Sequence, residues 1–137
     1  IDHEINASGV YAFEFFETSA GDFYINEAAP RVHNSYHLSI EGFSRSQFDL
    51  LIECALGLKI NEVEVKHKYL SMVNILGQNE GEDYNLSFTY SEGEYDFKIH
   101  LYGKKQARPG RKLGHLTLFG ESENFDFAQK INNEYRI

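Results

Sequence analysis

The sequence predicts an α+β fold built mainly of antiparallel strands. Two aromatic-rich segments flank a short glycine turn near the start of the chain, as in a β-hairpin. A capped, amphipathic helical pattern follows, and strand patterns fill the second half before a terminal helical pattern. We expect two domains, residues 1–57 with a sheet and a packed helix, and residues 58–137 as a small β-rich domain with a terminal helix.

Composition narrows the class of protein. The 137 residues are 42% hydrophobic and 25% charged, which is ordinary for a soluble globular protein with a modest core. The net charge of −8 argues against nucleic-acid binding, because a surface that binds phosphate backbones should be basic. Cys54 is the only cysteine, so no intramolecular disulfide is expected.

The chain has no apolar run near the roughly 20 residues that cross a bilayer. The single cysteine fits a reduced, cytoplasmic setting, no signal-peptide pattern opens the chain, and we expect no membrane partner. It begins at Ile1 rather than at methionine and soon reaches a strand pattern typical of an interior segment. We interpret the chain as part of something longer.

The first hairpin predicts a pair of facing carboxylates. Strands over Val10–Phe16 and Phe23–Glu27 joined by the four-residue turn Ser19–Asp22 pair Phe16 with Ile25, and Glu14 with Glu27. Opposite residues of an antiparallel pair share a face, with Cβ atoms about 5 Å apart.

Two such carboxylates repel unless a cation or a shared proton lies between them. Glu14 and Glu27 are therefore candidate ligands for Mg²⁺, a hard cation that prefers oxygen donors. The alternative is a different strand register that leaves one glutamate in solvent.

Residues 25–35 (INEAAPRVHNS) collect directional polar groups around one proline. Arg31 and His33 alternate, so both side chains can face one site. Arginine offers a bidentate fork for carboxylate or phosphate, and His33 is either a proton carrier, a donor to an oxyanion, or structural. Asn34 either caps the backbone or binds a ligand or metal.

A scaffold helix is predicted after residue 44. Ser44 and Gln47 have the spacing of a capping box, and Gly57 ends the helix. Its apolar residues recur at helical spacing: Phe48, Leu51, Ile52 and Ala55.

The second half reads as strands around a basic loop. Strands are expected over residues 69–76, 84–90, 97–102 and 113–119, with a helix over 122–133. Five of the 13 lysines and arginines lie within residues 104–112. A basic loop on an acidic protein is a candidate anion site, with phosphate the favoured anion. The alternative is a solvated hairpin tip, and nucleic-acid binding is the weaker third interpretation.

Three blocks together, residues 9–16, 25–35 and 102–115, resemble the C-terminal portion of the N5-carboxyaminoimidazole ribonucleotide synthetases. These are the ATPase subunits of phosphoribosylaminoimidazole carboxylase, ATP-grasp ligases of purine biosynthesis. The resemblance implies that ATP and bicarbonate give carboxyphosphate, which carboxylates 5-aminoimidazole ribonucleotide and leaves ADP and phosphate. It also implies the C-terminal part of an ATP-grasp fold over residues 1–57, and it allows a homodimer.

The resemblance assigns roles residue by residue. Glu14 and Glu27 are implied as magnesium ligands, and Asn26 with Glu27 as part of the ATP site. Arg31, His33 and Lys104 are implied to position bicarbonate and to stabilise carboxyphosphate.

The remaining implied residues bind the ribonucleotide. Arg111 and Lys112 are implied to bind its 5′-phosphate, with Lys104 and Asn34 also at the substrate. Phosphoryl transfer fits such residues, because it needs a cation and positive side chains around developing charge more than a protein nucleophile.

The chain also departs from the family pattern. The N-terminal half that carries the lysines holding adenine and triphosphate is absent, so that half is an expected partner and the chain alone should have negligible activity. Two alternatives remain open: another ATP-grasp ligase, such as a formate-dependent transformylase, and a non-catalytic interaction domain.

Overall fold

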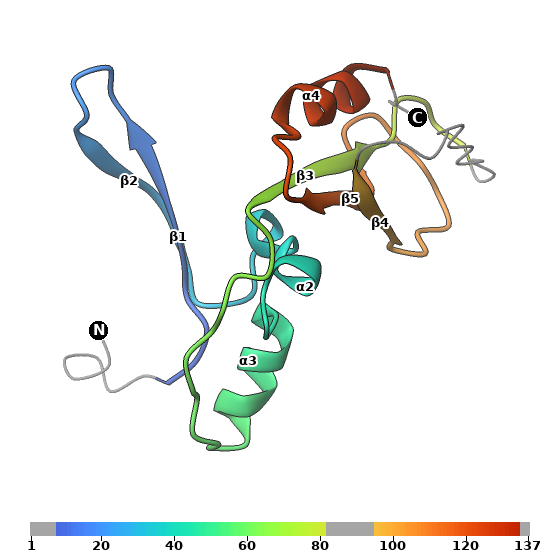
Figure 1. Ribbon diagram of the computed structural model, residues 1–137. Helices are drawn as coiled ribbons and strands as arrows, with labels where there is room; N and C mark the ends of the chain where they lie inside the picture. Colours follow the sequence, from blue (N-terminus) through green and yellow to red (C-terminus); the bar gives the residue numbers. More distant parts are fainter. Residues whose placement is uncertain (1–7, 82–94, 135–137) are drawn as a thin grey trace. The chain divides into compact units, whose positions relative to one another are not determined.

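The computed structural model describes residues 8–81 and 95–134. It combines helices with two antiparallel sheets, as the α+β prediction requires (Figure 1). The chain divides into two compact units, Ile1–Glu64 and Val65–Ile137, and each is described by itself. The predicted domain boundary after residue 57 stays a prediction. Within the described residues, no helix is long and apolar enough to span a membrane.

The first unit begins with the expected hairpin, β1 (Ala12–Glu17) and β2 (Phe23–Ala29). Its strands pair antiparallel, and Glu14 lies opposite Glu27 as predicted. The pairs nearer the turn differ from the prediction. Phe16 pairs with Tyr24 rather than with Ile25, because the loop has one residue more than expected.

A β-bulge restores the predicted carboxylate pair. The register shifts between Glu14 and Phe15, whose partners are Glu27 and Ile25, so Asn26 is the extra residue on β2. The longer loop and the bulge each change the count by one residue, and the two changes cancel at Glu14. The turn itself is held by the Thr18 N–H donating to the Asp22 carbonyl at 2.9 Å, with Gly21 at φ +86°.

Three short helices follow β2: a 3₁₀ turn η1 (Asn34–Tyr36), α2 (Ser39–Gly42) and α3 (Gln47–Ala55). The first two were not predicted from the sequence. The predicted capping box at Ser44 and Gln47 is wrong by two residues.

Ser46 is the N-cap of α3, and Asp49 completes the box by accepting from the Ser46 N–H at 2.9 Å. Ser44 instead accepts a hydrogen bond from the Glu64 N–H at 2.9 Å. Its own N–H donates to the Glu64 carbonyl at 2.8 Å. A side chain used to anchor a distant segment is not available to cap the helix.

The second unit is a three-stranded antiparallel sheet with the order β3–β5–β4 (Figure 1). Its strands are β3 (Tyr69–Leu76), β4 (Asp96–Leu101) and β5 (Lys112–Gly120), and α4 (Phe125–Glu134) contacts β3. All four elements match predicted segments. The strand predicted over residues 84–90 lies outside the described residues.

The core of this unit lies between the sheet and α4. Its buried residues are Val73, Leu116, Leu118, Ala128 and Ile131. The helix therefore turns Ala128 and Ile131 inward, whereas Phe125 at its start is 58% exposed. A second small cluster joins Ile75, Ala107 and Leu113. It connects the basic loop to the sheet.

Candidate functional site

The first unit brings Glu14, Glu27 and His33 together at the end of its hairpin. Nδ1 of His33 lies 3.4 Å from Glu14 Oε1, and Nε2 lies 3.8 Å from Glu27 Oε1. One ligand atom from each residue lies within 4.8 Å of the others. The imidazole is only 13% exposed, while the carboxylates are more open to solvent. We call these three residues the carboxylate–histidine cluster.

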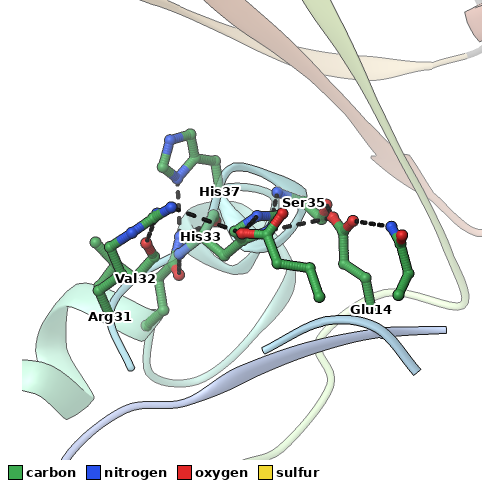
Figure 2. Close-up of polar contacts among 9 residues, drawn as sticks. Glu14, Arg31, Val32, His33, Ser35 and His37 are labelled. Atoms are coloured by element: carbon green, nitrogen blue, oxygen red, sulfur yellow. Dashed lines mark hydrogen bonds and ion pairs between the residues drawn. The ribbon is translucent and has the colours of Figure 1, made fainter. Parts of the chain in front are cut away.

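Hydrogen bonds from neighbouring side chains orient the Glu14 carboxylate (Figure 2). Ser35 Oγ donates to Glu14 Oε1 at 3.0 Å, and Asn26 Nδ2 donates to Glu14 Oε2 at 3.3 Å. The bulge is what places Asn26 there, because the extra residue leaves the regular ladder. Ser35 was missed in the sequence, although it closes the predicted polar segment.

Arg31 contributes the positive charge beside the cluster. Its Nη2 lies 3.8 Å from Glu27 Oε1, and its Nη1 donates to the Val32 carbonyl at 3.0 Å. Its side chain is 63% exposed, so this ion pair is weak and the guanidinium is accessible to an anion. The predicted convergence of Arg31 and His33 on one place is therefore met, because both reach the Glu27 carboxylate.

The donor set fits a magnesium ion. Two carboxylates, each held near the other by the hairpin, offer the hard oxygen atoms that Mg²⁺ prefers, and an amide and a hydroxyl donate hydrogen bonds to one of them.

The ring of His33 has a second polar contact. Its Nδ1 accepts a hydrogen bond from the Ser35 N–H, with 3.4 Å between the two nitrogen atoms. The two contacts of Nδ1 need different protonation states, because a lone pair accepts from Ser35 whereas an N–H donates to Glu14.

The backbone of His33 is held by Gln47, which the sequence pattern had predicted to cap α3. Oε1 of Gln47 accepts from the His33 N–H at 2.8 Å, and Nε2 of Gln47 donates to the His33 carbonyl at 2.9 Å. The Ser44–Gln47 capping hypothesis concealed this contact. Ser46 and Asp49 form a second capping pattern in the same stretch. This pattern was the available sequence signal that the side chain of Gln47 is not needed to cap the helix.

Phe13 and Phe15 of β1 line an apolar cavity of about 430 Å³ in the same unit. Gln47 and Leu50 of α3 also line it, so the hairpin and the helix both border the cavity. None of the three residues of the carboxylate–histidine cluster lines it.

In the second unit the basic loop forms one side of a polar cavity of about 500 Å³, and Glu80 and Gly81 complete its lining. Arg108 and Arg111 both line it, and Arg111 Nη1 donates to the Gln106 carbonyl at 3.0 Å. Lys112 begins β5 and is not part of the lining. Lys104 belongs to this unit as well, and its grouping with Arg31 and His33 stays a prediction.

The loop is anchored to the end of β3 by backbone contacts. The Gly77 N–H donates to the Arg111 carbonyl, and the Gly110 N–H donates to the Gly77 carbonyl, both at 2.9 Å. A Cβ on Gly77 would lie 2.6 Å from the Arg108 carbonyl oxygen, so only glycine allows this approach. The predicted anion site thus has a defined backbone.

Comparisons with known proteins match both parts of the chain. Residues 1–48 match the ATP-grasp domain, and residues 71–125 match the phosphoribosylaminoimidazole carboxylase C-terminal domain. The chain resembles the C-terminal portion of N5-carboxyaminoimidazole ribonucleotide synthetases. This confirms the resemblance drawn from residues 9–16, 25–35 and 102–115, and with it the expected fold class.

Individual relatives give the extent of the likeness. N5-carboxyaminoimidazole ribonucleotide synthase of Staphylococcus epidermidis is 39% identical over 124 residues, which are 90% of this chain and 32% of the relative. The phosphoribosylaminoimidazole carboxylase ATPase subunit of Aquifex aeolicus superposes with a TM-score of 0.78 at 30% identity, covering 98% of this chain and 41% of that one.

A third relative was crystallised with ligands. The N5-carboxyaminoimidazole synthase of Aspergillus clavatus, in complex with ADP and 5-aminoimidazole ribonucleotide, matches at TM-score 0.68 and 29% identity, covering 89% of this chain and 32% of that one. The chain thus spans about a third to two fifths of the length of these relatives.

Proposed function

We propose that the chain is the part of an ATP-dependent carboxylating ligase that carries one wall of the active site. The reaction converts ATP, bicarbonate and 5-aminoimidazole ribonucleotide to N5-carboxyaminoimidazole ribonucleotide, ADP and phosphate through carboxyphosphate. The observation that carries the proposal is the carboxylate–histidine cluster, with Arg31 beside it, in a segment similar to ATP-grasp domains.

The carboxylates of the cluster hold the metal. Glu14 and Glu27 bind Mg²⁺, and when bound the ion neutralises charge on the ATP phosphates. Asn26 and Glu27 form part of the ATP site. Asn26 also restricts the Glu14 carboxylate through its amide, which keeps the ligand oxygens converged.

The positive and polar groups next to the metal ligands bind the anionic substrate and intermediate. Arg31 and His33, joined by Lys104, bind bicarbonate and stabilise the charge of carboxyphosphate, because fixed donors lower the energy of charge that develops in the reaction. The exposed guanidinium and the nearly buried imidazole give one flexible and one fixed donor.

The basic loop binds the ribonucleotide. Arg111 and Lys112 bind the 5′-phosphate, with Asn34 assisting, and the cavity lined by Arg111 supports this assignment. The similar Aspergillus protein was crystallised with 5-aminoimidazole ribonucleotide, which makes this ligand the one to test.

Isothermal calorimetry with Mg²⁺ tests the metal half of the proposal. Glu14→Gln and Glu27→Gln should each weaken Mg²⁺ binding by about tenfold or more, since each removes one of two charged ligands. Glu17→Gln is the matched control, because Glu17 is exposed on the same strand and should leave the affinity unchanged. Equal Mg²⁺ affinity in all four proteins would contradict the metal assignment.

Calorimetry with 5-aminoimidazole ribonucleotide tests the substrate half. Arg111→Ala should abolish binding, whereas Lys105→Ala, in the same loop but outside the cavity lining, should retain it. Absence of both Mg²⁺ and ribonucleotide binding would favour a non-catalytic interaction domain. Binding of Mg²⁺ but not of this ribonucleotide would favour another ATP-grasp ligase, such as a formate-dependent transformylase.

A further inference from the structure

We infer that Gln47 is a positioning residue for the carboxylate–histidine cluster. It lies at the first helical position of α3, 14 residues after His33, and its carboxamide binds both backbone polar groups of His33. The assignment of Gln47 rests on contacts alone. Its meaning for the reaction rests on the role proposed for His33.

The polarity of the backbone fixes the orientation of the Gln47 amide. The His33 N–H is a donor and must meet the oxygen, while the His33 carbonyl is an acceptor and must meet the NH₂ group. In a β-sheet, the N–H and carbonyl of a residue can both bind the backbone of one residue on the neighbouring strand. Here the side-chain amide of Gln47 makes the same two hydrogen bonds to His33. A flipped amide would place like groups against each other at both contacts.

This orientation also determines the tautomer of His37. Nε2 of Gln47 lies 2.8 Å from His37 Nδ1, and an NH₂ group can only donate there. Nδ1 of His37 must therefore be an acceptor, so the ring proton sits on Nε2. The His37 ring also stacks on Phe48, with centroids 5.4 Å apart. One carboxamide thus ties η1 and the polar segment to α3.

Gln47 is itself held rigidly. It is 5% exposed, and its N–H donates to Ser39 Oγ at 3.0 Å, whose hydroxyl donates to the Tyr36 carbonyl at 2.6 Å. Ser39 is 3% exposed. The capping box at Ser46 and Asp49 stabilises the helix end directly beside it. Buried hydrogen bonds of this kind are costly to break, because each leaves an unsatisfied group.

The consequence falls on the His33 ring. His33 is extended, at φ −126° and ψ 146°, and its N–H and carbonyl are both bound to Gln47. With the backbone fixed, the ring can move only by rotation about its side-chain bonds, and the contacts of its two nitrogens with Glu14 and Glu27 oppose that rotation. Positioning residues act in this way when a small displacement of a reacting group is costly.

Hydrogen exchange measured by NMR on the 137-residue chain tests the contact. In Gln47→Met, which keeps the volume but removes the polar atoms, the His33 amide should exchange about tenfold faster. Ser46→Ala is the matched control. It weakens the same helix end but leaves the carboxamide, so His33 should remain protected. Equal protection of His33 in wild type and Gln47→Met would overturn the inference.

Gln47→Glu separates the two halves of the contact. A carboxylate still accepts from the His33 N–H but cannot donate to the His33 carbonyl or to His37. The His33 amide should stay protected, while ¹⁵N shifts of the His37 ring should lose the pure Nε2–H tautomer. The Leu50 amide, which donates to the Ser46 carbonyl, reports in every variant whether α3 is folded. An unchanged His37 tautomer in this variant would contradict the inferred orientation.

The link to the reaction is tested with Mg²⁺ and phosphonoformate, a stable anion with the carboxylate and phosphoryl groups of carboxyphosphate. Its binding should shift the His33 ring signals of the wild type, and Gln47→Met should bind about tenfold more weakly. Ser46→Ala should bind as the wild type does. Equal affinity in Gln47→Met, despite fast exchange at His33, would overturn the positioning role.

No shift at His33 in the wild type would instead count against the proposed function. The exchange and tautomer data would then still decide whether Gln47 holds His33. The two hypotheses therefore fail on different measurements.

Discussion

The two units of the chain are stabilised in different ways. In the second unit, the sheet and α4 enclose aliphatic side chains, and Leu116 and Leu118 of the central strand are at most 2% exposed. In the first unit, aromatic residues of the hairpin are largely exposed, with Phe23 at 66% and Phe16 at 62%. The buried residues of α3 and its surroundings are polar instead, chiefly Ser39, Ser46 and Gln47.

This difference indicates which interactions hold the side chains of the candidate site in place. A two-stranded hairpin without a covered face is marginally stable on its own. The carboxylate–histidine cluster is placed by hydrogen bonds from Ser35, Asn26 and Gln47 rather than by a hydrophobic core. Four experiments, from the largest expected effect to the smallest, test this contrast.

Leu116→Ala should have the largest effect. Its side chain lies in the core of the second unit at 2% exposure, and such truncations cost about 2–5 kcal/mol in the free energy of unfolding. Urea unfolding followed by circular dichroism measures the loss. Leu101→Ala, at 55% exposure on β4, is the control and should cost far less. Loss of His33 amide protection in Leu116→Ala would break the contrast between the units.

Gly77→Ala should follow, at about 1–3 kcal/mol, the usual cost of overpacking. The new Cβ meets backbone atoms of Arg108, which cannot move aside as a flexible side chain does. We expect lower stability and displaced amide signals across residues 108–111. The control is Gly81→Ala, because no described atom lies within 4 Å of its Cβ position. A Gly77→Ala protein with unshifted loop signals would contradict the close approach.

Ser46→Ala should cost about 1 kcal/mol of stability in α3, since it removes an N-cap and half of a capping box. Helicity and amide exchange in α3 measure this loss. Ser44→Ala distinguishes the two capping hypotheses. This variant should leave the stability of α3 unchanged. It should instead speed hydrogen exchange at the Glu64 amide, which donates a hydrogen bond to Ser44 Oγ. The reverse result would restore the capping box expected from the sequence.

Tyr102→Phe should have an effect close to that of Ser46→Ala, about 1 kcal/mol, because it removes the hydroxyl that lies 2.9 Å from Nδ1 of the buried His115. Tyr24→Phe is the exposed control. Urea midpoints of the two variants give the comparison.

Burial also raises the pKa of Tyr102 above its usual 10.0, because the charged form loses solvation. The folded state thus favours the neutral phenol. This contribution to stability is fully present below pH 10.0 and is lost as the pH rises through the higher pKa of the folded state. Absorbance titration of tyrosinate should show a late-titrating group that is absent in Tyr102→Phe. A titration identical in both proteins would remove Tyr102 as that group.

Regular elements of the second unit were predictable because their patterns are local. The strand expected over residues 69–76 has those bounds in the structure, and the strands near 97–102 and 113–119 shift by one residue at their ends. Alternating side chains and flanking glycines are features of neighbouring residues, so a sequence reveals them.

The carboxylate pair is a more instructive case. Glu14 and Glu27 do face each other, but the assumed pairs between them and the turn were wrong. The turn loop is one residue longer than expected, and the bulge shifts the register back by one residue, so the two differences cancel at Glu14. Neither feature has a distinct sequence signal here. The residue that forms the bulge, Asn26, is also the one that binds Glu14, so the irregularity is part of the site.

The sequence by itself determined which residue types are available: two glutamates at hairpin spacing, an Arg–x–His segment and a basic loop. It also determined the family resemblance. Only the tertiary structure decided which serine caps α3 and what Gln47 does, because both depend on partners 14 to 20 residues away. Capping patterns at Ser44 and Ser46 are locally equivalent. Long-range hydrogen bonds, to Glu64 and to His33, select between them.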